Sequence, residues 1–388
     1  MKKESSKSSF NTFQVATIAI LTSAFSLIMG LLIANTTNVD TKYSKELNNF
    51  ISDYLKLKDE YYEEIDDEEV LDKGLQAIIN SLDPYTTVID DSLSNTLETK
   101  LEGKYKGIGV EVYNDIYGNI IVDNVIDNTV AQKVGINSGD ILIKFNELSL
   151  SGVSTTDFVN MVKEAGDSNF TLKVLRNGEE KDFILKREEV ELTSVYTNVY
   201  EDNNKKIGYI YVELFALNTY DQFLSAINEL EQEGINSLIV DLRDNTGGHL
   251  NTVENMLNIF LDKTHVIYQI ESKVSKEKHY SESKKGKDYP VIVLVNEISA
   301  SASEIFASAM QEEYKAIIVG KTTFGKGTVQ EVLPYDQNIN YKITTKKWLT
   351  PNGKWINGVG VVPDVEVENN VDSDIDNQLQ EAIDILKK

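Results

Sequence analysis

The spacing of apolar and polar residues divides the chain into segments with different predicted structures. The first is 15–34, VATIAILTSAFSLIMGLLIA, a run of 20 residues without a charged side chain. A helix of about 20 apolar residues crosses the ~30 Å hydrocarbon core of a bilayer, so this run is predicted to be a single membrane helix. A cleaved signal peptide is the alternative, but it needs a shorter apolar core and a small-residue cleavage site, which the sequence around Ala34 matches poorly.

The charges on either side of this run predict its orientation. Lysines precede it within residues 1–14, whereas the sequence that follows it is acidic. Positively charged flanks stay in the cytoplasm. Residues 1–14 are therefore expected to be a cytoplasmic tail, and everything from Asn35 onward is expected to lie outside the cell membrane of a bacterium.

The next segment, 35–96, has an acidic and helical pattern. Its apolar residues fall on one stripe at spacings of 3, 4 and 3: Leu47, Phe50, Tyr54 and Leu57. Such a stripe predicts an amphipathic helix that packs on another domain or on a second copy of the chain. A second helix is predicted from Asp66 to Ser81, and Pro84 closes it.

Between residues 97 and 188 the pattern changes to short β-rich runs separated by glycines, among them GIGVEVY and FTLKVLRNG. Strands dominate this segment, with a helix near 155–164 and a short turn and helix at 129–136. This order of elements is typical of a PDZ domain.

From 189 to 370, strands alternate with helices. Nearly continuous apolar strands such as SLIVD and VIVLV predict an α/β layer structure with a buried and largely parallel sheet. A β-rich stretch follows, and the last helix is expected within 371–388. The sequence therefore predicts a multidomain protein of mixed α/β and β class.

Composition narrows the range of partners and of chemistry. The 62 acidic against 38 basic residues give a net charge of −24, which argues against binding nucleic acid. The chain has no cysteine, which excludes disulfides, a thiolate nucleophile and cysteine-ligated metal sites. Polypeptides or small molecules are the expected partners.

Active sites of α/β sheets form where strands end and helices begin. One such junction is DLRDNTGG, where Gly247 and Gly248 allow a sharp turn that leaves backbone N–H groups free to bind a substrate oxygen. An oxyanion hole needs such groups. An ordinary loop before a helix is the alternative interpretation.

The second junction is SASASE, which places Ser301 at the first turn of a helix. Nearby N–H groups and the helix dipole could stabilise negative charge on a substrate oxygen. Serine is also a common helix N-cap, and Ser301 with Glu304 fits a capping box, so a purely structural role is the alternative.

A serine nucleophile needs a base. His249, beside the paired glycines, would allow a triad of serine, histidine and aspartate. Lys326 is favoured instead, because a desolvated amine loses its proton readily and can then accept one from a hydroxyl. The sequence around Lys326 also nearly matches the pattern of a phosphate-binding loop, G-x-x-x-x-G-K-[ST]. However, Gly327 stands where the pattern requires a serine or threonine hydroxyl, and a strand is predicted after it where such a loop has a helix.

These motifs together resemble the carboxy-terminal processing peptidases, relatives of the tricorn protease core. SASASEIFASAM and VGKTTFGKGTVQ resemble their active-site signature, and DLRDNTGG, LDPYTTV and GVGVVPDVEV resemble further landmarks. The resemblance implies an α/β crotonase-like core, Ser301 as the nucleophile, Lys326 as the general base and Gln330 as the residue that orients the lysine. It also implies an oxyanion hole of the Gly247 and Ala302 N–H groups.

The same resemblance implies how substrates are recognised. The residues expected to bind a peptide carboxylate in the PDZ domain are Gly107, Ile108, Gly109 and Val110. Arg176 matches an arginine that links peptide capture to assembly of the active site in some members. The expected protein is a homodimeric serine endopeptidase, without metal or organic cofactor, that acts on extracytoplasmic polypeptides with free, apolar C-termini. A PDZ scaffold with an inactive core is the alternative.

Overall fold

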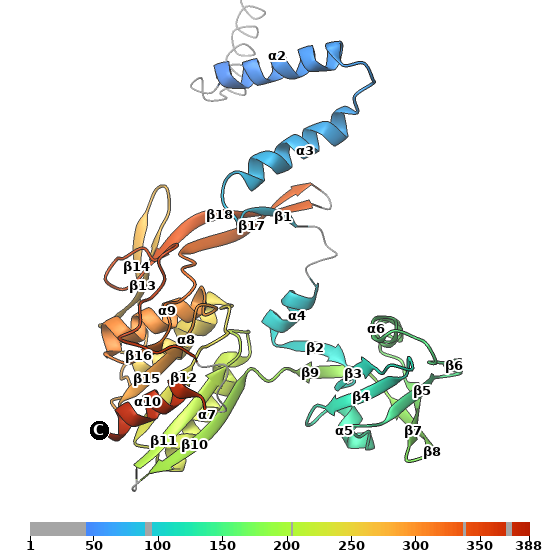
Figure 1. Cartoon of the computed structure of the whole chain (residues 1–388), viewed down its shortest axis with the longest axis vertical. Helices are drawn as coiled ribbons and strands as arrows, with labels where there is room; N and C mark the ends of the chain where they lie inside the picture. Colours follow the sequence, from blue (N-terminus) through green and yellow to red (C-terminus); the bar gives the residue numbers. More distant parts are fainter. Residues whose placement is uncertain (1–43, 90–94, 203–204, 337–338, 370–374) are drawn as a thin grey trace, which may run out of the picture. The chain divides into compact units, whose positions relative to one another are not determined.

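The computed structural model describes residues 44–89, 95–202, 205–336, 339–369 and 375–388 (Figure 1). The chain divides into two compact units, Met1–Ile78 and Ile79–Lys388. Each unit is described by itself.

Two helices make up the described part of the first unit, α2 (Ser44–Glu60) and α3 (Asp67–Asn80), which runs into the second unit. Asp66 caps α3, because its carboxylate accepts from the N–H groups of Glu68 and Glu69 at 3.0 and 3.3 Å. Three acidic residues in the first turn of α3 complement the helix dipole. The apolar stripe of α2 is exposed: Leu47, Phe50 and Leu57 show 49, 53 and 61% of their surface.

The helices that the structure describes correct the predicted localisation. None of them is both long enough and apolar enough to cross a bilayer. The longest, α2, has 17 residues and carries charged side chains along its length, whereas a membrane span needs about 20 apolar residues. The prediction of a cell-membrane protein with its catalytic part outside is therefore contradicted. Residues 15–34, on which that prediction rests, lie outside the described residues.

A β-rich part follows within the second unit. After α4 (Asn95–Glu102), a sheet has the order β3-β4-β5-β7-β8, with β6 at the edge of β5, while β2 pairs with β9. The bounds are β2 Lys104–Gly107, β3 Val110–Asn114, β4 Ile120–Val125, β5 Ile141–Phe145, β6 Leu148–Ser149, β7 Phe170–Arg176, β8 Glu179–Leu185 and β9 Glu188–Glu191. Two helices, α5 (Val130–Val134) and α6 (Thr155–Glu164), complete it. Phe158 of α6 packs into a core with Leu172 and Val174, so the apolar face of this helix closes the sheet.

The core of the second unit is a sheet of order β10-β11-β12-β15-β16-β19, parallel except for β10. Its strands are β10 Val195–Asp202, β11 Lys205–Val212, β12 Ser237–Asp241, β15 Val291–Val295, β16 Ile317–Gly320 and β19 Val365–Glu366. Every residue of β12 and β15 is buried. Helices on both faces explain these continuous apolar runs.

The two faces of this sheet bury different residues. Val240 and Val293 face the core that includes α7 (Thr219–Gln232), α8 (Leu250–Phe260) and α9 (Ala302–Ala309), whereas Ile239 and Ile292 contact the apolar side of α10 (Asn377–Lys387). A π-helical turn, Met310–Tyr314, continues α9. This arrangement places the start of α9 at the carboxyl end of β15.

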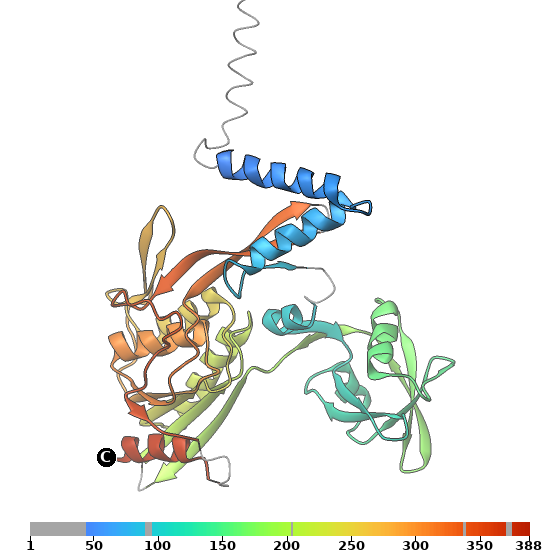
Figure 2. The same ribbon diagram turned by 45° about the horizontal axis from the view of Figure 1, so that its top comes forward.

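A second sheet, of order β1-β18-β13-β14 with β17 on β18, lies beside this core (Figures 1 and 2). Its strands are β1 Thr87–Ile89, β13 Val266–Glu271, β14 Lys276–Tyr280, β17 Thr328–Asp336 and β18 Ile339–Leu349. The pairing of β1 with β18, Thr87 opposite Lys342, brings residues from before the PDZ-like part to the strands that follow Lys326. The sequence did not predict this pairing.

Candidate active site

Ser301 lies between β15 and α9 in an unusual backbone conformation. Its φ is +56° and its ψ is −113°, a combination that costs a residue with a side chain of order 1–3 kcal/mol. Such a conformation persists only where its surroundings enforce it. The N–H of Ser301 donates to Glu304 Oε2 at 2.8 Å, which anchors the strained residue to the first turn of α9.

Glu304 is fully buried, and its carboxylate accepts four hydrogen bonds. Oε1 accepts from the Thr323 hydroxyl at 2.6 Å and from Gly325 N–H at 2.7 Å. Oε2 accepts from Ser301 N–H and from Lys326 N–H, both at 2.8 Å. Burial raises the pKa of Glu304, and the four donors oppose that shift. This carboxylate thus fixes the backbone of Ser301 and of Lys326 together.

Sequence reasoning found Glu304 only as a capping residue. The N–H of Ser301 does donate to it, as a capping box requires. Its bonds to the segment Thr323–Lys326 come from the tertiary fold. The one local signal is an acidic residue on a helix whose other residues are small or apolar, ASEIFASA.

Lys326 is half-buried on the segment between β16 and β17. Burial lowers the pKa of its amine, the charge of Lys342 lowers it further, and Glu304 opposes both. The amine nitrogen lies 5.0 Å from the ring centroid of Tyr85. Strand β17 begins at Thr328, so the helix that a phosphate-binding loop requires does not follow Lys326.

Gln330 lies on β17, four residues after Lys326. Its amide nitrogen donates to the hydroxyls of Thr328 and Thr344 at 2.9 and 3.1 Å. Among the described residues, no hydrogen bond joins Gln330 to Lys326. The expectation that Gln330 orients the lysine therefore stays a prediction.

Gly247 lies directly against the start of α9. A Cβ built on it would come within 2.7 Å of Ala300 O, 2.9 Å of Ser301 Cβ and 3.0 Å of Ala302 N. Only glycine fits this approach, and its φ of +105° also favours glycine. The two predicted oxyanion donors are thus brought together beside Ser301.

The two N–H groups differ in their partners. The N–H of Ala302 has no hydrogen-bond partner within the described part of the chain, as expected for the first turn of a helix. The N–H of Gly247 donates to Asn245 Oδ1 at 2.9 Å. The carbonyl of Asn245 accepts from Ala300 N–H and from the Ser303 hydroxyl, which ties this loop to α9.

His249 is directed elsewhere. It is the N-cap of α8, and its Nε2 lies 3.1 Å from the carbonyl oxygen of Leu101. In the ranges that the structure describes, no hydrogen bond joins it to Ser301. The triad through His249 therefore gains no support from the geometry.

In the PDZ-like part, the loop from Gly107 to Val110 leads from β2 to β3. The carbonyls of Ile108 and Gly109 accept from Ala131 N–H and Ile126 N–H at 3.1 and 3.0 Å. Their own N–H groups have no partner among the residues described. Backbone N–H groups arranged in this way can bind a peptide carboxylate.

Arg176, the predicted gating residue, is held inside the same part. Its guanidinium donates to both carboxylate oxygens of Asp140 at 2.6 Å and to Gly135 O at 2.7 Å. The side chain of Asp140 is only 1% exposed. The structure therefore shows Arg176 as the partner of a buried carboxylate, and a gating role stays a prediction.

Comparison with known proteins decides the family. The family model for peptidase family S41 matches residues 206–367, and the PDZ domain model matches residues 96–175. The carboxy-terminal processing protease CtpB of Bacillus subtilis (strain 168) is 34% identical over 345 residues, which cover 86% of this chain and 70% of CtpB. CtpA of the same organism is 35% identical over 92% of this chain and 76% of CtpA. The chain belongs to peptidase family S41.

The family establishes the class of activity. This S41 protein is a serine-type peptidase of the carboxy-terminal processing group with a PDZ domain, and its substrates are polypeptides. A photosystem II D1 C-terminal processing protease shares the fold, with a TM-score of 0.50 at 24% identity over 86% of this chain and 91% of that one. The mixed α/β multidomain fold and the enzyme class predicted from the sequence are thus confirmed.

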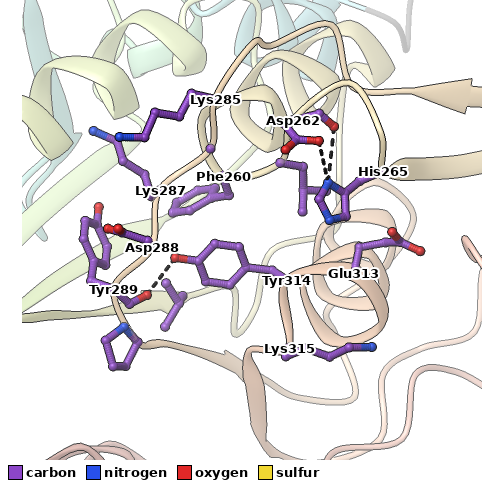
Figure 3. Close-up of a pocket in the computed structure, with 14 residues that line it drawn as sticks. Phe260, Asp262, His265, Lys285, Lys287, Asp288, Tyr289, Glu313, Tyr314 and Lys315 are labelled. Atoms are coloured by element: carbon purple, nitrogen blue, oxygen red, sulfur yellow. Dashed lines mark hydrogen bonds and ion pairs between the residues drawn. The ribbon is translucent and has the colours of Figure 1, made fainter.

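This S41 chain also has a hollow that is separate from the predicted catalytic residues. It has a volume of about 600 Å³ and lies between the end of α8 and the π-helical turn (Figure 3). Ser301, Lys326 and Gln330 do not line it. Both acidic and basic side chains line it, and His265 Nδ1 lies 3.0 Å from Asp262 Oδ1. In the part of the chain described, no group of three histidine or acidic side chains could hold a metal ion.

Proposed function

We propose that Ser301 is the nucleophile and Lys326 the general base of this serine peptidase. The observation that carries the proposal is the carboxylate of Glu304, whose Oε2 accepts from the backbone N–H of both residues. A buried carboxylate with four donors is a rigid link, so the two residues keep a fixed separation. Positioning of this kind is what an acyl-transfer site requires.

The chemistry follows from the charge state of Lys326. Burial and the charge of Lys342 favour the neutral amine, which accepts the proton of the Ser301 hydroxyl as its oxygen attacks the carbonyl carbon. The lysine then donates that proton to the leaving amine as the C–N bond breaks. Water attacks the acyl-enzyme in the second half of the reaction and releases the carboxylic acid, while Ser301 recovers a proton through the lysine.

The oxyanion of each tetrahedral intermediate needs N–H donors. Ala302 N–H, which has no hydrogen-bond partner among the described residues, supplies one. Gly247 N–H supplies the second once it leaves Asn245 Oδ1, to which it now donates at 2.9 Å. Gln330 is proposed to orient the amine of Lys326 in the active arrangement.

For the PDZ domain, we propose that the N–H groups of Ile108, Gly109 and Val110 bind the free C-terminus of the substrate. Apolar terminal residues are proposed because Val110, at the end of this loop, is apolar and only partly buried. Binding there is proposed to favour the active arrangement.

A homodimer is proposed through the apolar stripe of α2, because Phe50 and Leu57 are each more than half exposed. Burial of these side chains against a second copy would stabilise the pair. Light scattering coupled to size-exclusion chromatography tests it, and a monomer at every concentration would contradict it.

The experiment that tests the proposed activity compares the full chain with Ser301→Ala. The substrate is a peptide that ends in apolar residues with a free carboxylate, and its amidated form is the matched control. We expect cleavage by the unchanged chain, faster for the free acid, and none by the variant. Equal cleavage by both proteins would contradict the role of Ser301, and equal rates on both peptides would contradict the role of the PDZ loop.

A further inference from the structure

A segment that precedes the PDZ domain in the chain lies against the predicted base. Residues 83–86, DPYT, come directly before β1, and β1 pairs with β18. The Asp83 carboxylate organises this segment, because it accepts from Tyr85 N–H at 2.8 Å, Thr86 N–H at 3.0 Å and the Thr86 hydroxyl at 2.7 Å. Burial opposes its ionisation, but these bonds and one from Thr344 lower the pKa of Asp83 overall.

The segment is joined to β18 through Thr344. The Thr344 hydroxyl donates to Asp83 Oδ1 at 3.1 Å, and Thr344 N–H donates to the Thr86 hydroxyl oxygen at 3.1 Å. These bonds connect residues that are 261 and 258 positions apart in the chain. Tertiary contacts therefore hold Thr344 in one orientation.

The direction of these bonds fixes the carboxamide of Gln330. An ionised carboxylate only accepts, so the single hydroxyl proton of Thr344 is used by Asp83. Thr344 Oγ1 can then only accept from Gln330, and Gln330 Nε2 lies 3.1 Å from it. The nitrogen of the amide must face Thr344, which leaves Oε1 as the acceptor available to the amine of Lys326. Oε1 has no partner among the described residues.

The same segment covers the amine itself. Tyr85, whose N–H is held by Asp83, places its ring centroid 5.0 Å from Lys326 Nζ. An aromatic face at this distance attracts a protonated amine. The ring therefore lies at the side chain that the carboxamide of Gln330 is proposed to orient, and bonds to Asp83 contribute to the placement of both.

We propose that Asp83 is a positioning residue of the peptidase site, which orients Gln330 through Thr344 and holds Tyr85 over Lys326. The inference rests on the proposed role of Lys326 as the base. It makes residues 83–86 part of the active site, although family matches to the PDZ domain and the peptidase begin only at residues 96 and 206.

Thr344→Val in the full chain tests the relay, by which we mean the hydrogen bonds that link Asp83 through Thr344 to Gln330. Valine keeps the shape of threonine and lacks its hydroxyl. We expect kcat on the free-acid peptide to fall about tenfold or more with KM unchanged, since a misplaced base slows the chemical step. Thr344→Ser, which restores a hydroxyl, should recover most of the rate. Thr87→Val on β1 is the matched control, because Thr87 is exposed and its hydroxyl donates to the Val88 carbonyl, not to Asp83 or Gln330.

The decisive comparison repeats Thr344→Val in a Gln330→Ala background. Rates are read as phosphonylation of Ser301 by a fluorophosphonate, so that slow variants remain measurable. If Thr344 acts through Gln330, its substitution has no further effect in that background. An equal loss in both backgrounds, or no loss in either, overturns the proposal. This outcome can be told apart from failure of the proposed function itself. If Lys326 were not the base, Lys326→Ala would keep the ordinary rate of phosphonylation of Ser301, whatever the Thr344 variants do.

Discussion

The backbone N–H groups of Ser301 and Lys326 donate to the same carboxylate oxygen, Glu304 Oε2, each at 2.8 Å. The two residues are 25 positions apart and follow different strands of the central sheet, β15 and β16. One buried side chain therefore determines the geometry of the proposed nucleophile and base together.

Glu304→Gln is expected to destabilise the fold and abolish cleavage. An amide offers one acceptor oxygen, so its NH₂ group must face donors on one side, either Ser301 and Lys326 N–H or Gly325 N–H. Unpaired buried donors of this kind should lower the free energy of unfolding by about 3 kcal/mol. Urea unfolding measures the loss, and Glu297→Gln, an exposed glutamate nearby, is the control. Unchanged stability and activity would contradict the role given to Glu304.

The pH dependence of cleavage should report the amine of Lys326. The base must be neutral, so kcat/KM rises with pH as the amine loses its proton, with a midpoint below the ordinary value of 10.5 because burial lowers the pKa. Lys342→Gln removes a positive charge that also lowers this pKa, so the midpoint should move to higher pH. Lys346→Gln is the control, because Glu331 pairs with Lys346 at 2.7 Å. A shift to lower pH in Lys342→Gln would be the wrong sign for this account.

Gly247→Ala should reduce cleavage by a hundredfold or so, because its Cβ would collide with Ala300 O, Ser301 Cβ and Ala302 N where the oxyanion is proposed to bind. Gly234→Ala is the matched control for backbone strain alone. It has a φ of +81° in open space, so it should lose some stability and keep its activity. Peptide cleavage and thermal unfolding of both variants separate the two effects. If both variants had the same activity, the close approach of Gly247 to residues 300–302 could not be the cause of a loss of cleavage.

Arg176→Ala should unfold the PDZ domain more easily. It leaves the Asp140 carboxylate, 1% exposed, without its partner, and such a loss costs about 3–5 kcal/mol. Lys173→Ala, which breaks ion pairs with the exposed Glu180 and Asp182, should change the stability far less, because exposed ion pairs contribute little. Urea unfolding of the full chain, monitored by hydrogen exchange of the backbone amides in residues 104–191, measures the loss of stability in both variants. A stable PDZ domain with weakened activation by free-acid peptides would instead favour gating by Arg176.

Much of the site could be predicted because local patterns determine it. Apolar strands next to SASASE and DLRDNTGG place Ser301 and Gly247 at the same edge of a parallel sheet, and this edge is where the structure has them. The strand after Lys326 likewise follows from its alternating residues. These features depend on sequence neighbours, which a single sequence contains.

The rest depends on contacts between distant segments. The link from Glu304 to Lys326, the relay from Asp83 to Gln330 and the pairing of β1 with β18 join residues that no local pattern connects. Gly247 N–H illustrates the same limit, because a glycine turn predicts a flexible donor but not its present partner, Asn245. The prediction of a membrane location was wrong for another reason. It rested on the hydropathy of 15–34 and the charges on either side of it, and none of the described helices could span a membrane.

The most direct test of the central claim is the reaction of the full chain with a fluorophosphonate, followed by mass spectrometry of the modified peptide. We predict a single adduct on Ser301, formed increasingly fast as pH rises, and almost none in Lys326→Ala although that variant remains folded by circular dichroism. An adduct on another residue, or labelling of Ser301 at the same rate in Lys326→Ala, would contradict the proposed pairing of nucleophile and base.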